Sequence, residues 1–177
     1  MNAIAERAEK QRPPRKTETV ILFIVANQMF AISADSVQEI RSTDSLAGAA
    51  NEIDQQEVPK VRHTLERGRR TYFVVNAGMH FGLPVTRPAL VLILRQLRVA
   101  VLVDRIDRMA EISAVHPLPL AFAGEERRWY RGLAHLDDVV IPVVQPGGFL
   151  SAGEFQQLDR AAIAAASQRE MEGAVQA

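Results

Sequence analysis

The sequence contains a weak internal repeat at a spacing of 69 residues. Asp35–Ile40 recurs as Asp104–Met109, and 104 − 35 = 69. Val74–Gly78 recurs as Val143–Gly147, and 143 − 74 = 69. Two separate matches that share one offset and one order indicate two similar units in tandem, and this duplication constrains the fold more than any local pattern does.

The composition excludes several functional classes. Lys plus Arg equals Asp plus Glu at 21 each in 177 residues, so no net charge steers the chain toward nucleic acid or an anionic membrane. The lack of cysteine excludes disulfides, thiolate catalysis and cysteine-ligated zinc. No apolar run approaches the ~18 residues of a membrane span, and residues 1–16 lack the apolar core of a secretory signal. We therefore expect a cytoplasmic protein without direct membrane insertion.

Runs of β-branched and aromatic residues between turn residues predict strand pairs in both units. We expect four hairpins, which join residues 20–25 with 29–32, 61–65 with 71–75, 89–94 with 99–103, and 129–135 with 139–144. Val37 and Ile40, three residues apart after helix-capping residues, predict a short helical turn. Residues 47–59 are interpreted as a loop and 77–81 as a short helical crossover. Pro142 predicts an edge or bulge position for the last strand.

The carboxyl end predicts a helix. Ser151 and Glu154 fit a capping box, in which each side chain accepts a hydrogen bond from an otherwise unpaired amide. Phe155, Leu158 and Ala162 follow at helical spacing. The helix is expected from about residue 152 to 169, within a segment 151–172, with tails at 1–18 and 173–177. Repeated short strands followed by one helix predict an all-β fold of two small barrels.

The sequence contains no catalytic or metal-binding motif. It has neither a glycine-rich phosphate-binding loop nor a nucleophile elbow. Its four histidines are scattered without metal-ligand spacing, at 63, 80, 116 and 135. Asp137 and Asp138 at a solvated hairpin tip are interpreted as turn formers rather than an acid–base pair. We therefore expect a protein that is not an enzyme, with no cofactor, metal or small-molecule substrate.

One cluster favours an alternative function. Arg67, Arg69 and Arg70 lie beside Tyr72, a combination that small barrels use to bind single-stranded nucleic acid. Strand alternation places Tyr72 and Phe73 on opposite faces, so only one of them could stack beside the arginines. The other interpretation of the cluster is a charged hairpin tip.

Three segments resemble the CheW-like domain family, the bacterial chemotaxis coupling proteins and their relatives. Val20–Ile40 is similar to the family's opening, two strands followed by a Val-x-Glu-Ile step, here Val37–Ile40. Val99–Ile112 is similar to its second signature, an apolar strand that ends in Val-Asp-x-Ile. Trp129–Val144 is similar to the family's last hairpin. The ordered set of three is more specific than any one of them.

The resemblance covers residues 19–158 and implies two intertwined SH3-like five-stranded β-barrel subdomains, with the C-terminal helix packed on them. It also implies a non-enzymatic adaptor that couples the cytoplasmic tips of methyl-accepting chemoreceptors to a histidine autokinase, in an array at the inner membrane. In such proteins a receptor helix lies in an apolar groove between the barrels, and the regulatory domain of the kinase docks on the end of one barrel. By position, the implied partner-binding residues are Val37, Glu39, Ile40, Arg67, Gly68, Val103, Ile106, Met109 and Gly132.

The first hairpin departs from the family pattern. The repeat offset pairs His63 with Gly132, so a histidine stands where the family has a glycine, and the loop is one residue short. The proline expected after Arg67-Gly68 is replaced around Tyr72-Phe73. The receptor contact of Arg67 is therefore left open. Two variants of the adaptor role also stay open: a non-motility pathway such as a type IV pilus system, and a paralogue that binds the kinase but not receptors.

Overall fold

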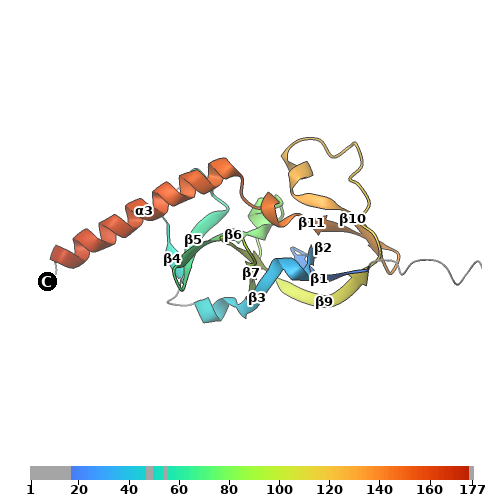
Figure 1. The fold of residues 1–177 in the computed structure, drawn as a ribbon, viewed down its shortest axis with the longest axis horizontal. Coiled ribbons are helices and arrows are strands. Elements are labelled where there is room, and N and C mark those ends of the chain that lie inside the picture. Colours follow the sequence, from blue (N-terminus) through green and yellow to red (C-terminus); the bar gives the residue numbers. More distant parts are fainter. Residues whose placement is uncertain (1–16, 47–49, 54–55, 176–177) are drawn as a thin grey trace, which may run out of the picture.

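The computed structural model describes residues 17–46, 50–53 and 56–175 (Figure 1). Most of the expected tail at 1–18, residues 1–16, lies outside the described residues, as do residues 176–177 of the expected tail at 173–177. The strands are β1 (Glu18–Val25), β2 (Gln28–Ser33), β3 (Val37–Ser42), β4 (Ala50–Glu52), β5 (Val61–Arg67), β6 (Arg70–Asn76), β7 (Leu90–Leu94), β8 (Val99–Val103), β9 (Arg105–Ile112), β10 (Tyr130–Leu136) and β11 (Val139–Val144). The helices are α2 (Ala77–His80) and α3 (Ala152–Val175), with 3₁₀ turns at Ala34–Ser36, Thr43–Leu46, Glu125–Arg128 and Pro146–Gly148.

The strands form two sheets with the same internal order. One sheet runs β10-β11-β2-β1-β9, and the other runs β5-β6-β8-β7-β3 with β4 added beside β5. Corresponding strands lie about 69 residues apart: β5 begins at 61 and β10 at 130, and 130 − 61 = 69. The repeat is thus confirmed by topology. One sheet has five strands as predicted, and β4 gives the other a sixth.

The two halves of the chain exchange strands. β3 pairs with β7, and its counterpart β9 pairs with β1, both antiparallel. The parallel pairs β6–β8 and β11–β2 also join one half to the other. We call the six-stranded sheet the first barrel and the five-stranded sheet the second barrel. Because each barrel contains strands from both halves, neither half can complete its hydrogen-bonded ladders alone.

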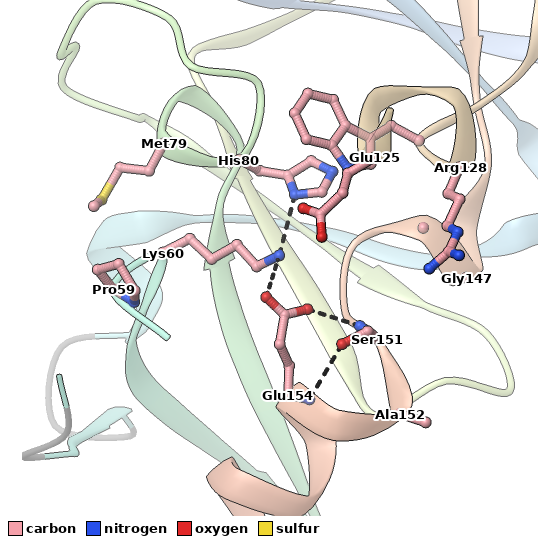
Figure 2. Close-up of a pocket in the computed structure, with 12 residues that line it drawn as sticks. Pro59, Lys60, Met79, His80, Glu125, Arg128, Gly147, Ser151, Ala152 and Glu154 are labelled. Atoms are coloured by element: carbon pink, nitrogen blue, oxygen red, sulfur yellow. Dashed lines mark hydrogen bonds and ion pairs between the residues drawn. The ribbon is translucent and has the colours of Figure 1, made fainter. Parts of the chain in front are cut away.

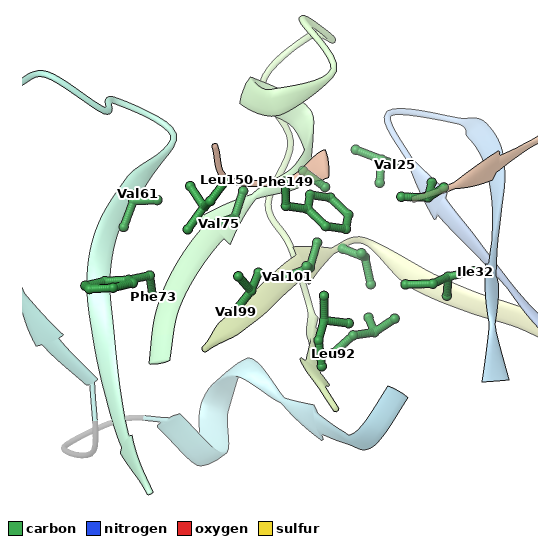
Figure 3. Packing of buried hydrophobic residues seen from close by; sticks show 14 of the residues in the cluster. Val25, Ile32, Val61, Phe73, Val75, Leu92, Val99, Val101, Phe149 and Leu150 are labelled. Atoms are coloured by element: carbon green, nitrogen blue, oxygen red, sulfur yellow. The ribbon is translucent and has the colours of Figure 1, made fainter. Parts of the chain in front are cut away.

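Central strands are buried on both faces, which explains why their sequences are apolar runs rather than alternating patterns. In β1, Val20 and Leu22 pack inside the second barrel, whereas Ile21 and Phe23 pack in a larger cluster between the barrels. We call this larger cluster the central core. Figure 3 shows it from close by, with side chains such as Phe73 from β6 and Ile32 from β2 directed into one shared interior.

Positive φ angles close the tight hairpins. Ala26 and Asn27 have φ values of 48° and 64°, and Asp137 and Asp138 have φ values of 50° and 63°. Two successive residues of this kind define the type I′ turn, whose twist matches the flanking strands. The interpretation of Asp137-Asp138 as turn formers is confirmed.

Two local predictions around the repeat are wrong. The helical turn expected at 37–40 is strand β3, and the helical element lies just before it, at Ala34–Ser36. The three-residue spacing of Val37 and Ile40 arises from a bulge, since the register with β7 shifts between Val37 and Glu39. The loop expected at 47–59 contains β4, which pairs with β5 and is too short to give a periodic signal.

The position of Pro142 also differs from the prediction. β11 lies inside its sheet, between β10 and β2, rather than at an edge, and the bulge in its ladder with β10 lies opposite Val143 and Val144, beside Pro142 rather than at it. β11 pairs with β2 at one position, Val143 opposite Ala31. Because proline has no amide hydrogen, Pro142 cannot donate to β2, but few hydrogen bonds are lost where the ladder is this short.

The C-terminal helix forms as predicted and is longer. The Ser151 amide donates to Glu154 Oε2 at 2.7 Å, and the Glu154 amide donates to Ser151 Oγ at 3.2 Å, which confirms the capping box. Leu158 is fully buried in the central core, and Arg98 donates two hydrogen bonds to Asp159 at 2.9 and 2.8 Å. The first turns of α3 therefore pack on the first barrel, and the later turns extend away from it (Figure 1). Within the described residues, no helix has the length and apolar character needed to cross a membrane.

Gly132 leaves no room for a side chain, which yields a stability prediction. A methyl group at 132 would overlap the carbonyl oxygen of His116, which is fixed to β10 by two backbone hydrogen bonds with Leu133. We expect Gly132→Ala to lower the free energy of unfolding by about 1–3 kcal/mol, the usual cost of overpacking. Gly147→Ala is the matched control, because the nearest atom to a methyl group there is 3.9 Å away. Urea unfolding measures both, and equal stability of the two variants would contradict the prediction.

Candidate protein-interaction surface

The exchanged strands β3 and β9 present apolar side chains to solvent. Ile40 is 40% exposed, Met109 is 61% exposed, and Ile106 is half-buried. Ile40 pairs with Leu92, Ile106 with Phe23, and Met109 with Ile21, and all three partners belong to the central core.

Paired residues of antiparallel strands share a face of their sheet. The central core therefore extends to the surface on the last strand of each sheet, through Ile40 on β3 and through Ile106 and Met109 on β9. We call these three residues the apolar seam. All three were predicted as partner-binding residues, and the structure brings them onto equivalent strands.

Two other predicted contact residues lie beneath the surface. Val37 is 7% exposed and Val103 is fully buried, and both belong to the central core. They sit at strand ends where the register directs the side chain inward, Val37 opposite Leu94 and Val103 opposite Leu90. Neither can meet a partner without rearrangement, so their role is to support the seam from below.

An ion pair closes the first barrel. Glu39 forms an ion pair with Arg67 and a second one with Arg41, whose Nε lies 3.1 Å from Glu39 Oε1. β3 and β5 stand near opposite ends of the sheet order, so a contact between them requires the sheet to curve round on itself. Glu39 and Arg67 thus meet beside Ile40, a contact between two predicted partner-binding residues that the resemblance did not imply.

The second barrel has the equivalent ion pair with its charges reversed. Arg108 of β9 contacts Asp137 Oδ2 at 2.6 Å, at the tip of the β10–β11 hairpin. The repeat offset relates Glu39 to Arg108, since 39 + 69 = 108, and it places the partner of Arg108 one residue beyond the counterpart of Arg67, since 67 + 69 = 136 and the acidic residue is Asp137. We did not predict this pair, although applying the offset to Glu39 and to the first hairpin tip would have indicated it.

The Arg108–Asp137 pair is solvent-exposed, whereas Glu39 and Arg67 are half-buried and the paired Nη1 of Arg67 is buried. An exposed pair contributes about 0–1 kcal/mol, so Arg108 and Asp137 orient the strands beside the seam more than they stabilise the fold. Gly68, at the first tip, has a φ of +60°, and a Cβ atom placed there would have no heavy atom within 4 Å, so the turn geometry rather than crowding favours glycine there. Gly132 lies in the buried part of β10, where its role is steric.

A second apolar feature is a hollow of about 390 Å³ beside β6 and β8. Val74 and Leu102 form its floor and belong to the core inside the first barrel. Val85, which is 97% exposed, and Met79, which is 41% exposed, stand at its rim with the cationic Arg62. We call this feature the first-barrel hollow.

Comparisons with known proteins agree with this geometry. The sequence model of the CheW-like domain matches residues 19–154. The chain belongs to the CheW-like domain family. The scaffolding protein TtCheW from Thermoanaerobacter tengcongensis has a similar fold, with a TM-score of 0.63 at 16% sequence identity, over 78% of this chain and 96% of that one. No curated protein sequence gives a significant match.

The CheW-like fold removes the aromatic component of the nucleic-acid alternative. Tyr72 is 4% exposed inside the first barrel, and Phe73 is fully buried in the central core. Arg67 is paired with Glu39, which leaves Arg69 and Arg70 as exposed cations at the hairpin tip. A stacking platform needs an accessible ring, so the interpretation as a charged hairpin tip fits the structure better.

The histidines do not assemble a metal site. His116 and His135 lie with their ring centroids 5.5 Å apart, and the described part of the chain holds no group of three or more candidate ligands. His80 is the exceptional one: it is 4% exposed and packs against Trp129 and Phe149. No periodic pattern indicates its burial, because it lies in the four-residue helix α2.

His80 makes stability depend on pH. Burial, together with the nearby Lys60 charge, lowers the pKa of His80 from 6.5 to about 3. Between these values the unfolded chain binds the proton and the folded one does not, so stability falls as the pH drops below about 6.5. The expected slope is about 1.4 kcal/mol per pH unit. Urea unfolding between pH 7 and 5 should show it in the wild type and in His63→Gln, but not in His80→Phe; an unchanged slope in His80→Phe would contradict the assignment.

Proposed function

We propose that this chain is a non-enzymatic signalling adaptor that couples chemoreceptors to a histidine autokinase. Membership of the CheW-like family supports the adaptor class, and the apolar seam is the observation that carries the coupling role. The adaptor would act in the cytoplasm and be recruited to a receptor array at the inner membrane.

The seam is suited to a helical partner such as the cytoplasmic tip of a methyl-accepting chemoreceptor. Helix-in-groove recognition uses apolar anchors spaced along one helix face, set against a rigid apolar surface with polar flanks. Ile40, Ile106 and Met109 supply the apolar surface, and their strands are held by the central core. Glu39 with Arg67 flanks one side, and Arg108 with Asp137 flanks the other.

Substitution in the seam tests receptor binding. We expect Ile40→Asp and Met109→Asp each to weaken co-sedimentation with receptor signalling domains by about 2 kcal/mol or more, because a carboxylate would be buried in the contact. Both side chains are exposed, so the variants should remain folded. Ile163→Asp is the matched control, since Ile163 is 68% exposed on α3, away from the seam.

Equal effects of the three substitutions would contradict a seam-specific receptor site. Wild-type protein that binds the kinase but not receptors would instead support the paralogue that has lost receptor coupling. Kinase capture from native lysate distinguishes a motility pathway from another one, such as a type IV pilus system.

The regulatory domain of the kinase is assigned to the first-barrel hollow. The resemblance implies a kinase regulatory domain of similar fold, and such a domain could place an apolar side chain against the half-buried Leu102, which already lines an open hollow. The exposed Val85 at the rim would be buried by such docking, which accounts for an apolar residue at a fully solvated position.

Separate docking of receptor and kinase gives a distinct test. We expect Val85→Arg to weaken binding to the kinase regulatory domain about tenfold or more and to leave receptor co-sedimentation unchanged. Leu120→Arg is the control, because Leu120 is also an exposed loop residue, at 90%. Calorimetry with the isolated regulatory domain measures this, and wild-type affinity in Val85→Arg would place the kinase elsewhere.

A further inference from the structure

Asp104 is the single residue between β8, in the first barrel, and β9, in the second. It belongs to the Val-Asp-x-Ile step of the sequence but has no place among the partner contacts proposed above. Its amide donates to the Ile24 carbonyl at 3.0 Å, and its Oδ2 accepts from the Ala26 amide at 2.7 Å. Asp104 is therefore fixed to the β1–β2 hairpin through both its backbone and its side chain.

The other carboxylate oxygen of Asp104 holds a loop. Oδ1 accepts from the Thr86 hydroxyl at 2.6 Å, a length typical of a charge-assisted hydrogen bond. We call this hydrogen bond the loop clamp. Thr86 lies in residues 83–89, which have no regular secondary structure, and it directly follows Val85, the exposed residue at the rim of the first-barrel hollow. The clamp thus connects a firmly held side chain to the neighbour of Val85.

The loop clamp is the only hydrogen bond that residues 84–87 make with the rest of the described chain. Pro84 and Pro88 have no amide hydrogen to donate. Each proline also fixes its own φ and holds the residue before it in an extended conformation. Val85 and Thr86 therefore keep most of the conformational freedom of the loop, and a contact that fixes Thr86 also restricts Val85.

Other residues that line the hollow are held by several contacts. Lys60 Nζ lies 2.8 Å from Glu154 Oε1 and 3.4 Å from His80 Nδ1, as the dashed lines in Figure 2 show. The Met79 amide donates to Asn76 Oδ1 at 3.0 Å, which caps α2. The loop is therefore the part of the lining whose position depends on a single hydrogen bond.

The repeat does not reproduce the loop clamp. Asp35 is the counterpart of Asp104, since 35 + 69 = 104, yet its exposed carboxylate makes no hydrogen bond or ion pair with any described residue. Its backbone carbonyl accepts from Arg95 Nε at 3.0 Å instead. The segment equivalent to 84–88 is 153–157, since 84 + 69 = 153 and 88 + 69 = 157, and it lies within α3. The carboxylate is thus used as a clamp in the half of the molecule that has a loop to hold.

We propose that Asp104 is a positioning residue for the kinase contact, because the loop clamp holds Val85 at the rim of the first-barrel hollow before the partner binds. This inference rests on the kinase site proposed above. A loop that is already ordered loses less conformational entropy on association, so the clamp raises affinity although Asp104 does not itself touch the partner.

Thr86→Val tests the clamp, because it removes the hydroxyl at nearly constant shape and leaves Asp104 bonded to Ala26. In the free full chain we expect the nuclear magnetic resonance order parameter of the Val85 amide to fall from about 0.85 in the wild type to below about 0.6 in Thr86→Val. Calorimetry with the kinase regulatory domain should show binding weakened about three- to tenfold, the usual cost of immobilising a residue on association. Thr86→Ser keeps the hydroxyl and should restore both values.

Asp104→Ala removes the anchor itself and should loosen Val85 as much as Thr86→Val does. Asp35→Ala is the matched control and should leave both the order of Val85 and kinase binding unchanged. Receptor co-sedimentation should be the same in Thr86→Val as in the wild type, since Thr86 lies outside the seam.

Two results would overturn the proposal. One is a Val85 amide that is as ordered in Thr86→Val as in the wild type, and the other is unchanged kinase binding in Thr86→Val when Val85→Arg weakens it. Wild-type affinity in Val85→Arg would instead overturn the kinase site. The order parameter, measured without the kinase, would still decide whether Asp104 holds the loop.

Discussion

The exchange of edge strands between the two halves is the constraint on which the rest of the structure depends. β3 completes the sheet that contains β7, and β9 completes the sheet that contains β1. The barrels are consequently tied together, and the central core fills the space between them. Its outer boundary is formed by the exchanged strands themselves, which is why Ile40 and Met109 reach solvent on a rigid support. The proposed interaction surface is thus a consequence of how the two barrels pack.

The duplication is symmetric in topology but not in charge. Glu39 on β3 faces the cationic tip of one hairpin, and Arg108 on β9 faces the anionic tip of the other. Each pair closes its barrel, yet a partner that lies along the seam would meet opposite charge orders on the two sides. Under the proposed function, such asymmetry would fix the direction in which a helical partner lies, because like charges placed together are penalised. The first-barrel hollow, with Val85 at its rim, lies outside this arrangement and leaves room for a second partner.

The sequence was sufficient for the features that short-range patterns encode. The repeat offset, the hairpins around Asn27 and Asp138, and the capping box of Ser151 and Glu154 were all predictable. The pairing of β3 with β7 was not predictable from local pattern, because residues some 50 positions apart meet only in the assembled fold. For the same reason Val37 and Val103 were expected at the surface, although the long-range register turns them inward. The buried His80 depends on rings from Trp129 and Phe149, which no local pattern connects to it.

The lack of cysteine permits a direct measurement of the seam. Single cysteines at positions 40, 109 and 163 can each be modified with a thiol reagent, in free protein and in complexes with receptor signalling domains. The account predicts that receptors slow modification at 40 and 109 together and leave 163 unchanged, because one helix would cover strands β3 and β9 at once. Protection of only one seam position, or protection at 163 instead, would contradict a shared binding surface along the exchanged strands.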